Sequence, residues 1–152
     1  MTLTIFLDTG PLGIVTNPKA NQETKECVTW LKSCLANGAR VCIPEICDYE
    51  LRRELIRADK AKGLGRLDAI IQSVDYVPLS TAMMRKAAEF WANARKSGKP
   101  TAPDHALDGD VILAAQAALS VTSEDELVVA TTNIGHLATF VNAKLWRDIT
   151  PA

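Results

Sequence analysis

Residues 5–15 read IFLDTGPLGIV, so an apolar run from Ile5 to Leu7 leads directly into Asp8-Thr9-Gly10. Two unrelated kinds of active site begin in this way. In an aspartic protease, an Asp-Thr-Gly turn supplies one of two carboxylates that share a proton. In an α/β metal site, an aspartate at the end of a buried strand holds a divalent cation. The pattern of the remaining chain decides between the two.

Strand and helix patterns alternate along the sequence. Short apolar runs predict strands at residues 5–7, 40–44, 75–80 and 126–133. Apolar side chains at 3.6-residue spacing predict helices at residues 22–37, 45–58, 64–74, 81–96 and 111–119. We expect loops over residues 9–21 and 97–110, and a helix break at Gly63 and Gly65. This alternation predicts a mostly parallel sheet covered by helices on both faces.

The helical content argues against an aspartic protease, because that class is rich in β-strands. Nor does the chain contain a second Asp-Thr-Gly or Asp-Ser-Gly. A metal site is therefore the favoured interpretation of Asp8. The simpler alternative is that Asp8 only shapes the turn after its strand, together with Gly10 and Pro11.

The composition is that of one globular domain spanning residues 1–152. Hydrophobic residues make up 47% and charged residues 23% of the chain, and the net charge is −1, which is unlike that of a polycation that seeks nucleic acid. No signal peptide or membrane span is indicated, so we expect a cytoplasmic protein. The four cysteines lack C-x-x-C spacing and predict buried free thiols.

Polar side chains follow the predicted strands and should meet at one edge of the sheet. Asp8 follows the first strand and Asn133 follows the last, and the carboxyl ends of parallel strands share an edge. Glu50 lies on the helix after the second strand, and Asp110 precedes the apolar helix at residues 111–119. Oxygen ligands of this kind suit Mg²⁺ or Mn²⁺, and such a site suits phosphodiester hydrolysis.

Two of these assignments have close competitors. Asp108 and Asp110 lie two residues apart, so a regular helix aims them in nearly opposite directions. Both could cap the helix, and we favour Asp110 as the ligand because it leads directly into the apolar run. Glu50 and Glu54 lie one helical turn apart, and spacing alone barely separates them.

A basic stretch follows Glu50 on the same predicted helix. Arg52, Arg53 and Arg57 could track the phosphates of an RNA beside the acidic site. The commoner interpretation of such a stretch is a solvated helix face.

Four stretches together resemble a known family. The chain is similar to PIN domains, and more narrowly to the VapC-type toxins of bacterial toxin–antitoxin pairs. The resemblance covers nearly the whole chain and rests on the order and spacing of IFLDTGPL, IPEICDYELRREL, DGDVILAAQAAL and LVVATTNIGHLATF.

The resemblance implies roles for particular residues. Asp8 matches the first metal ligand of the family, Thr9 orders the site beside it, Glu50 matches the acid on the helix, and Asp110 matches the later aspartate. Thr131 stands where the family often has threonine.

Asn133 departs from the family pattern, because an aspartate is commoner at its position. An amide oxygen binds a metal ion more weakly than a carboxylate, so the number of ions stays open. Asp108 and Asp104 are the candidates to compensate.

The resemblance also implies a fold and an activity. The expected fold is a three-layer α/β/α sandwich with five parallel strands. The expected activity is Mg²⁺- or Mn²⁺-dependent cleavage of RNA by a homodimer, inhibited by an antitoxin protein. One alternative is a non-catalytic module of the same fold that binds RNA or protein. Another is a phosphatase with a nucleophilic Asp8, which Gly10 disfavours because such enzymes commonly carry a second aspartate there.

Overall fold

Five parallel strands form a single sheet at the centre of the computed structural model, which describes residues 2–98, 104–120, 126–135 and 137–151. The strand order is β3-β2-β1-β4-β5, and all the paired neighbours are parallel. The strands are β1 (Leu3–Leu7), β2 (Arg40–Pro44), β3 (Asp75–Val77), β4 (Glu126–Thr131) and β5 (Ala143–Leu145). β2, β3 and β4 lie within the predicted segments, β1 begins two residues before the segment predicted at residues 5–7, and β5 was not predicted.

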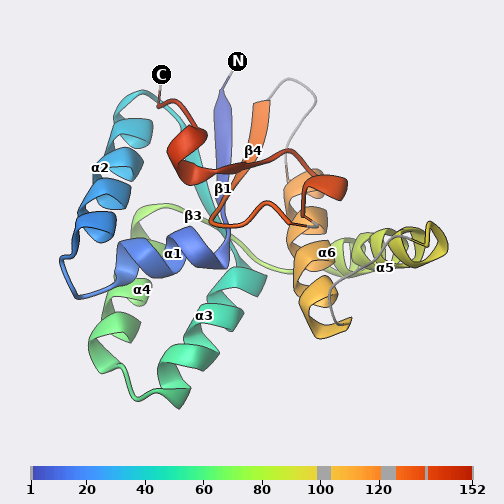
Figure 1. Cartoon of the computed structure of the whole chain (residues 1–152), viewed down its shortest axis with the longest axis horizontal. Helices are drawn as coiled ribbons and strands as arrows, with labels where there is room; N and C mark the ends of the chain where they lie inside the picture. Colours follow the sequence, from blue (N-terminus) through green and yellow to red (C-terminus); the bar gives the residue numbers. More distant parts are fainter. Residues whose placement is uncertain (1, 99–103, 121–125, 136, 152) are drawn as a thin grey trace.

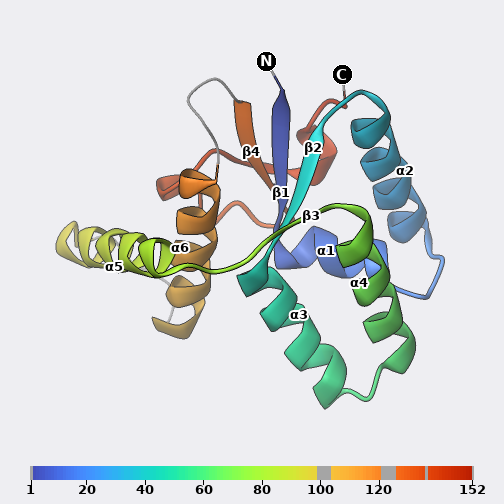
Figure 2. The same cartoon turned by 180° about the vertical axis from the view of Figure 1, so that it is seen from behind.

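Helices cover both faces of this sheet. They are α1 (Thr9–Thr16), α2 (Gln22–Ala36), α3 (Glu45–Arg57), α4 (Ala61–Ser73), α5 (Thr81–Lys96) and α6 (Asp104–Leu119). In both overall views α1, α2 and α4 lie to one side of the strands, and α5 and α6 lie to the other (Figures 1 and 2). This arrangement confirms the three-layer sandwich. None of the helices in the described ranges is long and apolar enough to cross a bilayer.

The core is built around β1, which lies between β2 and β4. Its residues Ile5, Phe6 and Leu7 are completely buried, as an apolar run with neighbours on both faces should be. The four cysteines are buried free thiols, as predicted. Burial of so many apolar side chains supplies most of the free energy that holds the sheet edge in place.

Two helix boundaries differ from the sequence prediction. The expected loop over residues 9–21 instead begins with α1, which starts directly after its N-cap, Asp8. Gly63 and Gly65 lie inside α4 rather than at a break. The chain turns earlier, at Asp59, whose φ of 54° is left-handed.

The start of α6 also corrects a prediction. Residues 99–103 of the expected polar loop lie outside the described residues, but the helix already begins at Asp104. Asp108 and Asp110 therefore lie within α6 rather than at its first residue, so neither is the N-cap of that helix. Leu107 explains the longer helix, because it is completely buried between α5 and α6 beside Ala87 and Val111.

Candidate active site

The candidate site lies where the chain changes direction across the sheet. From β1 the strands β2 and β3 follow on one side, whereas β4 lies on the other side of β1. Crevices at the carboxyl ends of strands form at such a switch in strand order. Asp8 lies directly in this position, and its backbone N–H donates to the carbonyl of Ala130 in β4 at 2.9 Å.

The Asp8 carboxylate is fixed by hydrogen bonds to both of its oxygens. Oδ1 accepts from the backbone N–H of Thr9 at 2.8 Å, and Oδ2 accepts from the Thr131 hydroxyl at 2.8 Å. Since the first bond caps α1 and the second reaches the end of β4, the carboxylate is aimed by two elements at once. Asp8 therefore does shape the chain after its strand, as the simpler interpretation proposed. Both of its carboxylate oxygens still keep lone pairs that could bind a metal ion.

Glu50 reaches the same place from α3. Its Oε1 accepts a hydrogen bond from the Thr9 hydroxyl at 2.8 Å. Thr9 therefore holds both acids, Asp8 through its backbone N–H and Glu50 through its side chain. The competing acid, Glu54, is exposed and pairs with Arg57 instead.

Gly109 brings α6 against Glu50. A Cβ atom at residue 109 would lie 2.7 Å from Oε2 of Glu50, so any larger residue there would displace that carboxylate from its position. Neighbouring side chains point apart, as their spacing predicts: Asp108 is exposed and Asp110 is half-buried. Gly109 was not predicted as a site residue, although a glycine between two aspartates next to an apolar helix was the available signal.

Gly10 plays a similar part on the other side of the site. A Cβ atom at residue 10 would lie 2.8 Å from Cγ2 of Thr132 and nearer still to its hydroxyl. The close approach lets the first turn of α1 pack against the segment that follows β4. The glycine of the Asp-Thr-Gly motif thus serves packing rather than a protease turn.

Thr131 and Asn133 contribute in different ways. The Thr131 hydroxyl is buried, donates to Asp8 and accepts the backbone N–H of Asn133 at 3.1 Å. Asn133 is exposed, and a Cβ atom at Gly135 would lie 3.4 Å from its Oδ1. The hydrogen bonds thus tie the backbone of Asn133, rather than its amide side chain, to the acidic cluster.

Cys47 lies beneath the two acids. Its Sγ is 3.8 Å from Oδ1 of Asp8, and its side chain is completely buried. Burial first, and then the nearby charge of Asp8, raises the pKa of this thiol well above its usual range. Without a bound metal ion, Cys47 is therefore a neutral thiol at neutral pH.

The donors at this site are those of a hard cation. In the described ranges no group of three or more His, Cys, Asp or Glu side chains is already gathered as a metal site. Two carboxylates are enough for Mg²⁺, which usually keeps several waters. Asp8 and Glu50 supply that pair, and Asp110, half-buried beside Gly109, is the candidate third acid.

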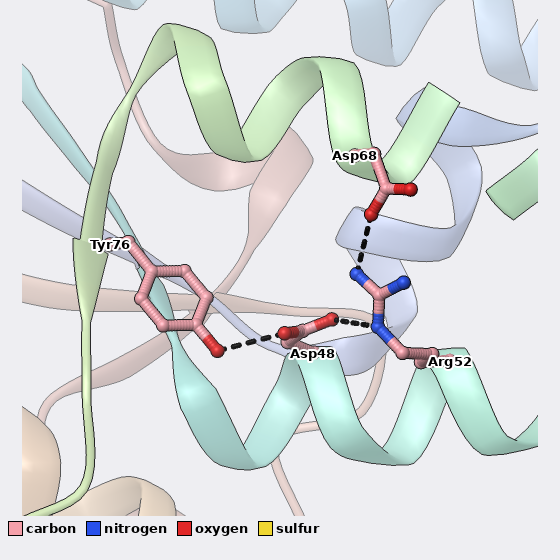
Figure 3. Close-up of polar contacts among 4 residues, drawn as sticks. All are labelled: Asp48, Arg52, Asp68 and Tyr76. Carbon is pink, nitrogen blue, oxygen red and sulfur yellow. Dashed lines mark hydrogen bonds and ion pairs between the residues drawn. The ribbon is translucent and has the colours of Figure 1, made fainter. Parts of the chain in front are cut away.

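The arginines after Glu50 separate into paired and unpaired side chains. Arg52 binds Asp48 at 3.0 Å and Asp68 at 2.7 Å, and Asp48 also accepts from the Tyr76 hydroxyl at 2.8 Å (Figure 3). This network ties α3 to α4 and β3, so the Arg52 charge is already neutralised. Arg57 pairs with Glu54.

Arg53 differs from its two neighbours. Its guanidinium carbon lies 4.9 Å from the ring centroid of Tyr49, and in the described part of the chain it forms no ion pair. Of the three arginines predicted to follow RNA, Arg53 therefore keeps the most available charge.

A cavity of about 740 Å³ lies elsewhere, between α1, α3 and α4. Leu51 and Leu55 line it from α3, and Asp59 is the one acid of its lining. Glu50, on the same helix, does not line it. We place the chemistry at the carboxylates rather than in this cavity, because a single acid beside lysines and leucines offers no constellation for hydrolysis.

Comparison with solved structures shows what this fold is similar to. One similar structure is that of VapBC2 from Rickettsia felis bound to a DNA fragment from the promoter of these proteins. A chain of it superposes with a TM-score of 0.70 and 16% identity, and the match covers 94% of this chain and 98% of that one. A chain of DNA-bound VapBC from Salmonella typhimurium gives 0.66 and 20%, covering 95% and 99%. One of VapBC-1 from nontypeable Haemophilus influenzae gives 0.63 and 14%, also covering 95% and 99%.

These likenesses confirm the expected fold over nearly the whole chain. At identities of 14% to 20% they concern the fold and do not by themselves assign a reaction. No family model and no curated protein sequence matches the chain.

Proposed function

We propose that this chain is a metal-dependent endoribonuclease and the toxin of a VapBC-type toxin–antitoxin pair. The observation that carries the proposal is the position of Thr9, which holds the carboxylates of Asp8 and Glu50 together at the switch in strand order. The fold shared with chains of VapBC structures supports the same assignment.

Asp8, Glu50 and Asp110 are the residues that would hold Mg²⁺ or Mn²⁺. When bound, such an ion offsets charge on a phosphoryl oxygen and lowers the pKa of an attacking water. The protein residues prepare the site for it. Thr131 and Thr9 fix the two carboxylates, and we propose that Asn133 helps to orient the water for an in-line displacement at phosphorus.

The surroundings of the acids serve the same chemistry. Cys47 packs its buried thiol against Asp8, with Sγ 3.8 Å from Oδ1, on the interior side of the site. Gly109 lets Glu50 sit against α6, which carries Asp110. Thr9 thus joins the acids of two elements far apart in the sequence, and we propose that Asp110 reaches the same edge of the sheet from α6.

The partners follow from the same proposal. We propose RNA as the substrate and a homodimer as the working form. We propose an antitoxin protein as the inhibitor, which would place a side chain against the acids, as an arginine often does in the similar family. The similar structures of Rickettsia felis and Salmonella typhimurium are VapBC assemblies with DNA. For this chain we propose a cytoplasmic toxin that cleaves RNA when no antitoxin covers its site.

The test is cleavage of RNA by the purified protein with Mg²⁺, with Mn²⁺ and with a chelator. Wild type should cleave only with the metals, and Asp8→Asn should not cleave. Asp59→Asn is the matched control, because Asp59 is an acid outside the site. Cleavage that survives Asp8→Asn would refute the assignment.

A second function is favoured by one observation, the exposed amide of Asn133 where the similar family commonly has an acid. It is a non-catalytic module of this fold that binds RNA or protein. The same experiment separates the two, because this module leaves RNA uncut with either metal although metal can still change RNA binding.

A further inference from the structure

Tyr49 and Arg53 form an exposed aromatic and cationic pair on α3, beside the proposed catalytic acid. Tyr49 is 55% exposed, and the Arg53 guanidinium lies over its ring at 4.9 Å. The cation–π contact with Arg53 holds this tyrosine ring at the surface, outside the buried clusters of the core.

The pair lies next to Glu50 on the same helix. At about 100° per residue, Arg53 lies about 40° around the helix from Tyr49 and about 60° from Glu50. Hydrogen bonding to Tyr49, and further the charges of Glu50 and Glu54, raise the pKa of Arg53. Around the helix axis, Arg53 thus lies between Tyr49 and Glu50, the acid that Thr9 holds in the site.

The free charge of Arg53 points to an anionic ligand. Arg52 and Arg57 on the same helix are each paired with carboxylates, whereas Arg53 has no such pairing within the described residues. A phosphate beside the site would meet this guanidinium, and an unstacked base would meet the exposed ring or the guanidinium plane. Both contacts together match a nucleotide of a single-stranded RNA.

We propose that Tyr49 and Arg53 form a nucleotide platform that binds one base and one phosphate of single-stranded RNA next to the bond to be cut. The proposal rests on the proposed nuclease function, but its test does not require cleavage. Tyr49 supplies a surface for the base, and Arg53 supplies charge for the phosphate. Neither residue takes part in the chemical step.

The test is binding of labelled RNA in the presence of a chelator, measured by fluorescence anisotropy. The probes are a mixed-sequence strand of about twelve nucleotides, within the site size of single-strand binding proteins, and an abasic strand with the same number of phosphates. Wild type should bind the strand with bases at least about fivefold more tightly. Tyr49→Ala should bind both strands equally, and Tyr49→Phe should keep the preference.

Arg53 is tested by salt dependence. Arg53→Ala should lower the slope of log affinity against log salt by about 0.7, the value for one phosphate of a single strand. Arg57→Ala is the matched control, because Arg57 lies one turn further along α3 and is already paired with Glu54. Its slope should change less.

Several outcomes overturn the platform. They are wild-type binding to neither strand, a base preference that survives Tyr49→Ala, and a Tyr49→Ala variant that changes only the oligomeric state in size-exclusion chromatography. The last result would instead make this face of α3 a protein interface. Intact binding without metal-dependent cleavage would refute the nuclease and keep the platform. Unchanged RNA binding in Tyr49→Ala together with intact cleavage would refute the platform and keep the nuclease.

Discussion

The hydroxyl of Thr131 at the end of β4 donates a hydrogen bond of 2.8 Å to Oδ2 of Asp8 at the end of β1. The two residues are far apart in sequence, yet their strands are neighbours at the switch in strand order. This bond fixes the direction of the Asp8 carboxylate from the side opposite Thr9. Removing this bond therefore tests whether the orientation of the Asp8 carboxylate matters for function.

Thr131→Val removes this hydrogen bond and nearly keeps the shape of the side chain. We expect metal affinity and RNA cleavage to fall by about 10- to 100-fold, the usual effect of losing a group that orients a ligand. Mn²⁺ binding followed by electron paramagnetic resonance measures the first, and an RNA cleavage assay measures the second. Thr131→Ser keeps a hydroxyl and should keep most of both. Equal loss in the serine and valine variants would contradict an orienting role.

Gly109→Ala should separate activity from stability. The new Cβ would lie 2.7 Å from Oε2 of Glu50, so the carboxylate must move, whereas alanine favours a helix over glycine by about 1 kcal/mol. We expect weaker cleavage at an unchanged or higher melting temperature. Gly65→Ala is the matched control, because a Cβ there has no neighbouring atom within 4 Å and should leave cleavage unchanged. Full activity of Gly109→Ala would argue against the placement of Glu50.

Asp110 and Asp108 should differ strongly when each is replaced by asparagine. Asp110 is half-buried and proposed as a ligand, whereas Asp108 is exposed on the other side of α6. We expect Asp110→Asn to lower cleavage by more than about 100-fold, beyond the usual effect of outer groups, and Asp108→Asn to lower it little. Circular dichroism checks that both variants are folded. A larger loss in Asp108→Asn would exchange their roles.

The buried cysteines make stability depend on alkaline pH. Burial raises the pKa of Cys27 to about 12 and those of Cys34 and Cys42 to about 11, from an ordinary 9.0. Below pH 9 these thiols are neutral in both states. Above it the unfolded thiols ionise and the folded ones do not, so the free energy of unfolding falls as pH rises.

Urea unfolding at about pH 7 and about pH 10 measures this fall. Cys27→Ala should reduce it by up to about 1.4 kcal/mol per pH unit, the value for one group. An identical pH dependence in the wild type and in this variant would show that Cys27 does not remain protonated in the folded protein.

Much of the fold could be predicted because its signals are local. The continuous apolar run of β1 and the periodic pattern of α2 each indicate their element without tertiary information. Helix α1 was missed because it is short and contains Gly10 and Gly13, both weak helix formers. β5 was missed because it has only three residues, which carry little pattern of their own.

The residues of the candidate site could be predicted from the sequence better than the contacts between them. Asp8 and Glu50 could be named because one follows a strand and the other matches a family motif. That Thr9 joins them, or that Gly109 packs against Glu50, depends on how α1, α3 and α6 cross in space. The ion pair between Arg52 and Asp68 on α4 likewise could not be predicted from the sequence of α3 alone.

Anomalous diffraction from a crystal soaked in Mn²⁺ is the sharpest test of the metal site, because it locates the cation without knowledge of the RNA. We expect a peak within coordinating distance of the carboxylates of Asp8 and Glu50, at the carboxyl end of β1. A crystal with an open site that shows no peak there at millimolar Mn²⁺, or shows it only elsewhere, would refute the proposed metal site.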